Sequence, residues 1–425
     1  MTRVLTPAAR RYAMLILATA YMFNFLDRQI MAILLPALRV EFQASDTILG
    51  LLSGTAFALF YVTLGIPIAR LAERFNRRNL LAWAIAIWSG MTMLCGVASN
   101  IWQLAAARIG VGIGEAGGSP PAHSMISDMY PPEQRSTAMG FYTVGISAGI
   151  MLAYLAGGWV VQNIGWREAF YIVGAPGLLL ALVVRFTMIE PKRGASEERS
   201  DSGKQPGFME VLKFLLARRS FLHMAIAAGL SSFIGYAVIT FFPSFITRSY
   251  DMQIASLGLW LGLILGFAGG AGFVGGGIIA DKLGSSRQRN AMRFIAAIML
   301  FSCVLNIAVF LAPTAFWCLV LFILPAFFSN MYLAPVLAQA QSLVSLRMRA
   351  TASALMLFII NLIGLAMGPP LVGGLSDMLA SRFGEESLRY SLLIFCLVLL
   401  PWAAAHYYLA GNTIEKDLER ATDHD

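Results

Sequence analysis

Long apolar runs alternate with short polar connections along the whole chain. A helix that crosses a bilayer needs about 20 mostly apolar residues, and the pattern predicts twelve such helices. The expected spans are residues 12–37, 48–70, 79–98, 101–128, 136–161, 168–188, 221–247, 253–280, 293–311, 314–340, 350–375 and 389–410. The predicted fold class is therefore an all-α membrane protein with 12 transmembrane helices.

The longest polar interruption lies near the middle of the chain. It reads Glu190-Pro-Lys-Arg-Gly-Ala-Ser-Glu-Glu-Arg-Ser-Asp-Ser-Gly-Lys and has the composition of a charged linker. Six spans precede it and six follow. We expect an N-terminal six-helix bundle at 1–189, a cytoplasmic linker at 190–219 and a C-terminal six-helix bundle at 220–425.

Composition supports the membrane assignment and narrows the function. Hydrophobic residues make up 58% of the chain and charged residues 13%, whereas soluble domains carry about 25% charged residues. The four cysteines lie in apolar runs without a CxxC pair, which predicts small core residues and no metal site. With no nucleophile motif and no cofactor motif, the chain is not expected to be an enzyme, and no catalytic residue is assigned.

Most of the 31 lysines and arginines lie in the even-numbered connections and at the termini. Connections rich in basic residues stay in the cytoplasm. Both termini of this multi-pass protein are therefore expected in the cytoplasm, and the cell inner membrane is the expected location. The net charge of +8 follows from this topology, so no nucleic-acid partner is expected.

Residues Gly112–Gly117 match the pattern G-x-G-x-x-G. A dinucleotide-binding turn needs a strand before it and a helix after it, but this stretch lies inside a predicted span. The glycines of this span are instead expected to let helices approach closely. Pro120 and Pro121 follow and should kink the helix near Glu115.

The two halves repeat each other at two of their connections. Glu73-Arg74 after the second span matches Asp281-Lys282 after the eighth, and Arg135 after the fourth matches Arg349 after the tenth. Internal repeats of this size build many transporters, whose substrate site lies between the repeats. The twelve helices are therefore expected to form two pseudo-symmetric six-helix bundles.

These motifs resemble those of the major facilitator superfamily over nearly the whole chain. Its usual motif after the second span is G-x-L-a-D-R-x-G-R-R, which here has Ala69, Leu71, Ala72, Glu73, Arg74, Asn76, Arg77 and Arg78 in order. The phrases Asn24-Phe-Leu-Asp27-Arg28 and Gly112-Ile-Gly-Glu115-Ala are similar to the spinster branch. The resemblance implies the major facilitator fold and a sphingolipid or lysolipid cargo.

The same resemblance implies cytoplasmic gating contacts that latch the two halves in the outward-facing state. They would be made by Glu73, Arg74, Arg77, Arg78, Asp281 and Lys282. The alternative is that these residues serve only as charges that set the topology.

Four charged residues lie inside the first-half spans, and such residues mark functional sites by default. Asp27 and Arg28 belong to the first span, and Arg108 and Glu115 to the fourth. We expect two pairs across the helices, Asp27 with Arg108 and Glu115 with Arg28. The alternative is that these are static pairs that lock two helices.

A carboxylate that gains and loses an arginine partner during transport can bind and release a proton, because burial and a nearby arginine act oppositely on its pKa. Glu115 is the first candidate for proton coupling and Asp27 the second. Arg28 and Arg108 are expected to bind an anionic head group, since a guanidinium binds phosphate or carboxylate through two parallel hydrogen bonds.

Aromatic residues mark the second half instead, where the span interiors hold no charged residue. Phe233, Tyr236, Phe328 and Tyr332 are the candidates to line the path of an apolar tail. The expected function is proton-coupled secondary active transport of an amphipathic or lipid-like anion by alternating access, carried out by a monomer. Alternatives are a small organic-anion or multidrug porter of the same fold, a lipid scramblase, and a membrane enzyme.

Overall fold

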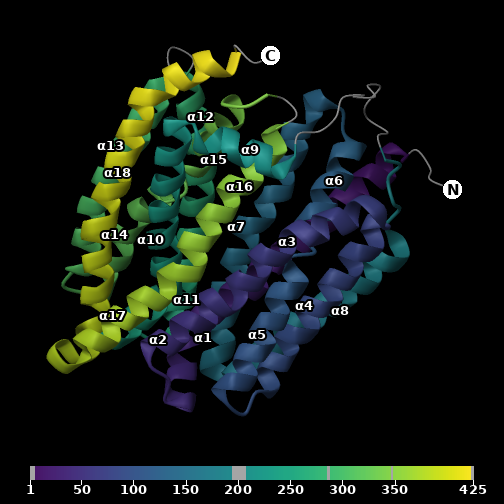
Figure 1. Ribbon diagram of the computed structural model, residues 1–425. Coiled ribbons are helices and arrows are strands. Elements are labelled where there is room, and N and C mark those ends of the chain that lie inside the picture. The colour runs from purple at the N-terminus through teal and green to yellow at the C-terminus, as the bar shows by residue number, and fades with distance from the viewer. Residues whose placement is uncertain (1–4, 194–206, 285–287, 346–347, 423–425) are drawn as a thin grey trace. The chain divides into compact units, whose positions relative to one another are not determined.

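The computed structural model describes residues 5–193, 207–284, 288–345 and 348–422, and within these ranges it contains helices and no strands (Figure 1). The elements are α1 (Pro7–Phe42), α2 (Asp46–Gly50), η1 (Leu51–Thr55), α3 (Ala56–Arg74), α4 (Arg77–Val97), α5 (Ile101–Glu115), α6 (Ser119–Met129), α7 (Pro132–Asn163), α8 (Trp166–Thr187), α9 (Phe208–Leu216), α10 (Arg219–Tyr250), α11 (Ile254–Leu263), η2 (Ile264–Gly269), α12 (Gly270–Gly284), α13 (Gln288–Phe310), α14 (Ala315–Phe328), α15 (Leu333–Ser342), α16 (Arg349–Asn361), η4 (Leu362–Met367), α17 (Gly368–Phe383), η5 (Gly384–Glu386) and α18 (Ser387–Thr422).

The helices account for the twelve expected spans. Among the described residues, nine stretches are long and apolar enough to cross a membrane, and the last of them, Thr351–Glu419, contains the two final spans. The other two are α1, whose polar residues lower its hydropathy, and the pair α5–α6, which is interrupted after Glu115. The all-α twelve-helix fold expected from the sequence is confirmed.

The chain forms two compact units with the same pattern of neighbours. In the first unit α1 packs along α7, α4 along α8, and α3 and α4 against α5. In the second, α10 packs against η4 and its flanking helices, α13 along α18, and α12 and α13 against α14. Because each contact in one unit has its counterpart in the other, the two bundles are pseudo-symmetric.

The first unit also includes the start of the eighth span, residues Gln253–Gly262. Gly158 of α7 faces Gly258 of α11, and a Cβ atom on Gly158 would lie 3.0 Å from the Cα of Gly258 and 2.7 Å from the carbonyl oxygen of Ile254. The backbones meet because neither position carries a side chain. The linker expected at 190–219 is partly helical, since it contains α9, while residues 194–206 lie outside the described part of the chain.

Large apolar side chains cover the outside of the helices. Trp102, Phe186 and Met378 are exposed to 76%, 73% and 78% of their surface. Apolar surface on this scale marks an interaction surface rather than a water-facing one, and in a bundle of spanning helices that surface contacts lipid.

Arg77 links the ends of three neighbouring helices in the first bundle. Its guanidinium is 1% exposed and donates to Glu190 Oε1 at 2.9 Å, to Ser124 Oγ at 2.9 Å, to the carbonyl oxygen of Pro191 at 2.8 Å, and to Asp128. These groups come from the start of α4, the end of α6 and the chain that follows α8. One buried cation therefore fixes three neighbouring helix ends.

Replacing Arg77 by alanine should destabilise this bundle strongly. The change leaves the carboxylates of Asp128 and Glu190 without their shared cation, and breaking a buried pair from one side lowers the free energy of unfolding by about 3–5 kcal/mol. The apparent melting temperature of the purified protein should fall, whereas Arg11→Ala, at an exposed position on α1, should leave it unchanged. Equal melting temperatures for the two variants would contradict the role given to Arg77.

Candidate functional site

The fourth span is divided immediately after its glutamate. Asn100 caps the start of α5 by accepting from the backbone N–H groups of Trp102 and Gln103, and α5 ends at Glu115. Residues 116–118 form a turn, and α6 begins with prolines in its first turn, where the missing N–H is tolerated. The break expected near Glu115 is thus confirmed.

Glycines bring α5 close to its neighbours. A Cβ atom on Gly114 would lie 2.6 Å from the backbone nitrogen of Trp88 in α4, and one on Gly110 would lie 2.6 Å from the Sδ atom of Met91. A larger residue at Gly114 would push α5 away from the backbone of α4, whereas one at Gly110 would have to displace the Met91 side chain. The G-x-G-x-x-G match therefore belongs to helix packing, and it places the end of α5 deep inside the first bundle.

Arg28 of α1 and Glu115 of α5 form a buried ion pair. The Nη2 and Nε atoms of Arg28 donate to Glu115 Oε2 at 2.7 Å and 3.2 Å. The residues are 7% and 1% exposed. Oε1 of the same carboxylate is buried without a hydrogen-bond partner among the described residues. This pairing, expected from the sequence, is confirmed, and it ties α1 to α5.

Three aromatic rings surround the guanidinium of Arg28. Its Cζ atom lies 4.7 Å from the ring centroids of Phe57 and Tyr61 and 5.0 Å from that of Phe25. Each ring face attracts a cation. We call these three rings the aromatic cage. These contacts to Arg28 do not involve Glu115, so they can hold the guanidinium in place when its ion pair with Glu115 is broken.

The second expected pair does not form. Both carboxylate oxygens of Asp27 and the Nε and Nη2 atoms of Arg108 are buried without a hydrogen-bond partner in the described part of the chain. Arg108 instead reaches the backbone carbonyl oxygen of Asp27 from Nη1 at 3.5 Å, and its Cζ atom lies 5.4 Å from the centroid of Phe57. Arg108 is still close enough to interact electrostatically with the Asp27 carboxylate, because both residues face the same polar centre.

This polar centre lies within one bundle and mixes both charges. Asp27 lies close enough to interact electrostatically with Glu115 as well as with Arg108. The hydroxyl of Thr92 lies beside Asp27, and the side chain of Asn24 lies beside Glu115. Two arginines and two carboxyl groups thus share a desolvated volume, in which Arg28 and Glu115 form an ion pair. Such a cluster can rearrange its partners when a proton or an anion arrives.

The four aromatic candidates of the second bundle occupy different environments. Phe233 is buried with its ring 5.1 Å from that of Phe395, and Phe328 packs edge-on against Phe301 at 5.6 Å. Tyr332 is also buried. Tyr236 is half-buried and donates to Asn361 Oδ1 at 3.3 Å. That these four side chains line the path of a substrate's apolar tail stays a prediction.

The gating candidates divide into two groups. Arg77 and Arg78 bind groups of their own bundle, since the backbone N–H of Arg78 donates to Glu190 Oε2 at 2.8 Å and its Nη1 atom to the carbonyl oxygen of Met188 at 3.2 Å. The side chains of Arg74 and Lys282 are exposed. The side chains of Glu73 and Asp281 lie outside what the structure describes, so the latch stays a prediction.

The aromatic cage around Arg28 was not predicted from the sequence. Phe57 and Tyr61 lie four residues apart in the second span, a spacing that puts them on one helix face, and Phe25 lies three residues before Arg28. This spacing is a usable signal, but it competes with many other aromatic pairs in a chain with 28 phenylalanines. The partners of Arg77 also went unnoticed, because Asp128 and Glu190 are distant from it in sequence.

Comparisons with known proteins agree with this architecture. Residues 17–369 match the family model described as Major Facilitator Superfamily. An MFS-type efflux pump from Mycolicibacterium smegmatis is 32% identical over 407 residues, covering 95% of this chain and 93% of that protein. Protein spinster homolog 3 from Danio rerio is 28% identical over 422 residues, covering 92% and 82%.

A solved structure provides a further match. The crystal structure of a bacterial homolog to the human lysosomal transporter Spinster, in an inward-facing and unoccupied conformation, has a TM-score of 0.87 and 31% sequence identity. The match covers 97% of this chain and 99% of that chain. The twelve-helix fold, the family model and these relatives together show that the chain belongs to the Major Facilitator Superfamily, as a transporter of its spinster branch.

Proposed function

We propose that this chain is a proton-coupled secondary active transporter of an amphipathic or lipid-like anion, working by alternating access. The observation that carries the proposal is the buried Arg28–Glu115 pair with the cluster around it. A guanidinium held by three rings offers an anion a prepared binding group. An anion that binds the Nη2 and Nε atoms of Arg28 displaces Glu115. A displaced buried carboxylate takes up a proton because an unpaired buried charge is costly.

Asp27 supplies a second place for a proton in this scheme. Its carboxyl group is buried and has no hydrogen-bond partner among the described residues. A carboxyl group in that position is neutral when protonated and exchanges its proton when Arg108 approaches. Anion binding and proton binding are then linked through one shared set of four side chains.

A small organic-anion or multidrug porter is the second candidate. The relative from Mycolicibacterium smegmatis is named an efflux pump. The two arginines of the polar centre, Arg28 and Arg108, suit a small carboxylate as well as a lipid head group. The aromatic residues of the second bundle favour a substrate with an apolar tail. Cargo size therefore distinguishes the two candidates, and the coupling mechanism is the same for both.

Glu115→Gln should abolish coupling to protons. A pH difference of one unit supplies about 1.4 kcal/mol per proton, which is a tenfold accumulation. Wild-type proteoliposomes should therefore accumulate a fluorescent lysophospholipid analogue about tenfold per coupled proton and pH unit. The glutamine variant accepts a hydrogen bond from Arg28 but does not titrate, so the analogue should only equilibrate.

Glu41→Gln is the matched control, because Glu41 is a half-exposed carboxylate paired with Arg167 on the surface. It should accumulate the analogue as the wild type does. Accumulation by Glu115→Gln at the wild-type level would reject Glu115 as the coupling group and leave a static pair. Flux that is equal in all proteins and indifferent to pH would identify a facilitator or scramblase, and no flux would direct the search to small organic anions.

Arg28→Gln should weaken binding of an anionic head group selectively. A hydrogen bond to a charged group contributes about 1.5–3 kcal/mol, so affinity should fall about 10- to 100-fold. Isothermal titration with an anionic amphiphile and with an uncharged analogue of the same chain length measures the difference. The uncharged analogue should bind equally well to both proteins.

The double variant Arg28→Gln/Glu115→Gln removes one positive and one negative charge together. Neither residue of the pair then leaves an unpaired buried charge that would destabilise the fold. Loss of anion binding should persist there. Arg167→Gln removes a surface arginine and should bind both analogues as the wild type does. Equal losses for the charged and uncharged analogues would contradict recognition of charge by Arg28.

A further inference from the structure

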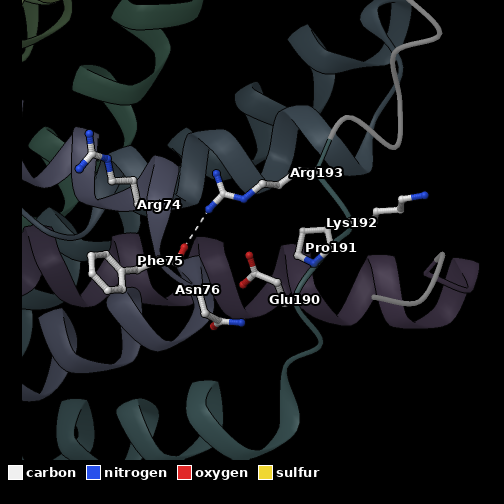
Figure 2. Close-up of a pocket in the computed structure, with 7 residues that line it drawn as sticks. All are labelled: Arg74, Phe75, Asn76, Glu190, Pro191, Lys192 and Arg193. Atoms are coloured by element: carbon white, nitrogen blue, oxygen red, sulfur yellow. Dashed lines mark hydrogen bonds between the residues drawn. The ribbon is translucent and has the colours of Figure 1, made fainter. Parts of the chain in front are cut away.

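A pocket of about 390 Å³ opens beside the connection between α3 and α4. Its lining is Arg74, Phe75, Asn76, Glu190, Pro191, Lys192 and Arg193 (Figure 2). The connection joins two membrane-spanning helices, so the pocket lies at the membrane surface. It is separate from the polar centre around Glu115, and of its lining residues only Arg74 is among the gating candidates.

The Arg193 side chain is fixed across this pocket. Its Nη2 atom donates to the carbonyl oxygens of Ala72 and Phe75, at 2.7 Å and 2.8 Å, and Figure 2 shows the bond to Phe75. These carbonyl groups belong to the last turn of α3 and the residue after it. A guanidinium has five N–H donors, so Nε and Nη1 keep three donors for another partner.

The other polar groups of the pocket are also donors. The Oδ1 atom of Asn76 already accepts from the backbone N–H of Asn79 at 2.9 Å, which leaves its amide N–H groups. Arg74 and Lys192 are exposed, and within the described residues neither side chain makes a hydrogen bond or ion pair. Three cations and an amide therefore line one open pocket.

The described hydrogen bonds of Glu190 join its carboxylate to Arg77 and Arg78 and not to these cations. Its Oε1 atom accepts from Nε and the backbone nitrogen of Arg77, and its Oε2 atom accepts from the backbone nitrogen of Arg78. Among the described residues, the pocket thus offers several donors and three cations that no ion pair joins to a carboxylate. Such a set of donors matches an anion with several oxygens. Phosphate has that chemistry, and lysine and arginine both bind it.

Apolar side chains border the same pocket. Phe75, which lines the pocket, is 60% exposed, and Ile189, which precedes the lining residue Glu190 in the chain, is 44% exposed. A lipid head group lies where basic groups meet apolar surface, whereas a soluble phosphate needs no such surface. We infer that this pocket binds a phosphate ester at the membrane surface, with the head group of an anionic phospholipid as its source.

The test is equilibrium binding to the full-length detergent-purified protein, with short-chain phosphatidylglycerol and glycerol 1-phosphate as probes. The lipid should bind more tightly than the soluble ester. Arg74→Gln/Lys192→Gln removes two exposed cations without breaking a described bond, and should weaken lipid binding about tenfold. Arg193→Gln should weaken it as well.

Arg11→Gln/Lys213→Gln is the matched control, since it removes the same charge from two exposed positions outside the pocket. It should leave lipid affinity unchanged, and melting temperatures verify that each variant is folded. If glycerol 1-phosphate binds as tightly as phosphatidylglycerol, and the pocket variant loses affinity for both probes, the ligand is a soluble phosphate and the lipid source is overturned. Equal losses in pocket and control variants, or no loss in either, would overturn the site. The assay measures no transport, so its failure is distinct from failure of the transport proposal.

Discussion

A charge inside a bilayer is costly unless another group neutralises it, and the Arg28–Glu115 pair meets this condition in the first bundle. Much of the local architecture serves to bring the two side chains together. Glycines of α5 let that helix press against α4, and α5 ends at the glutamate itself. The aromatic cage then surrounds the cation from α1 and α3.

Two of the three buried arginines described in this bundle, Arg77 and Arg28, show how the same side chain makes different contacts. Arg77 has its hydrogen bonds distributed over two carboxylates, a hydroxyl and a carbonyl group. The contacts of Arg28 include one carboxylate oxygen and three ring faces. Arg77 thus links helix ends through hydrogen bonds to several groups, whereas Arg28 combines an ion pair with contacts to aromatic rings.

The sequence predicted the fold almost completely, because twelve apolar runs and two repeated motifs depend only on local composition and spacing. It also predicted the helix break after Glu115 from two prolines, and the Arg28–Glu115 pair from four intramembrane charges. It was wrong about Asp27 and Arg108, which share a polar centre without an ion pair. Helical spacing gives the face of a side chain, but not the rotamer that decides which of two neighbouring carboxylates an arginine reaches.

The aromatic cage has a consequence for selectivity. An organic cation that seeks the cage competes with Arg28, which is attached to the same bundle and cannot diffuse away. A tethered group acts at an effective concentration in the millimolar range, so a cation dissolved at micromolar concentration is at a disadvantage of about a thousandfold at equal intrinsic affinity. An anion that approaches Arg28 meets a matching rival, because the Glu115 carboxylate is attached to the same bundle. At this pair a dissolved ion of either sign therefore competes with a tethered group of the same sign.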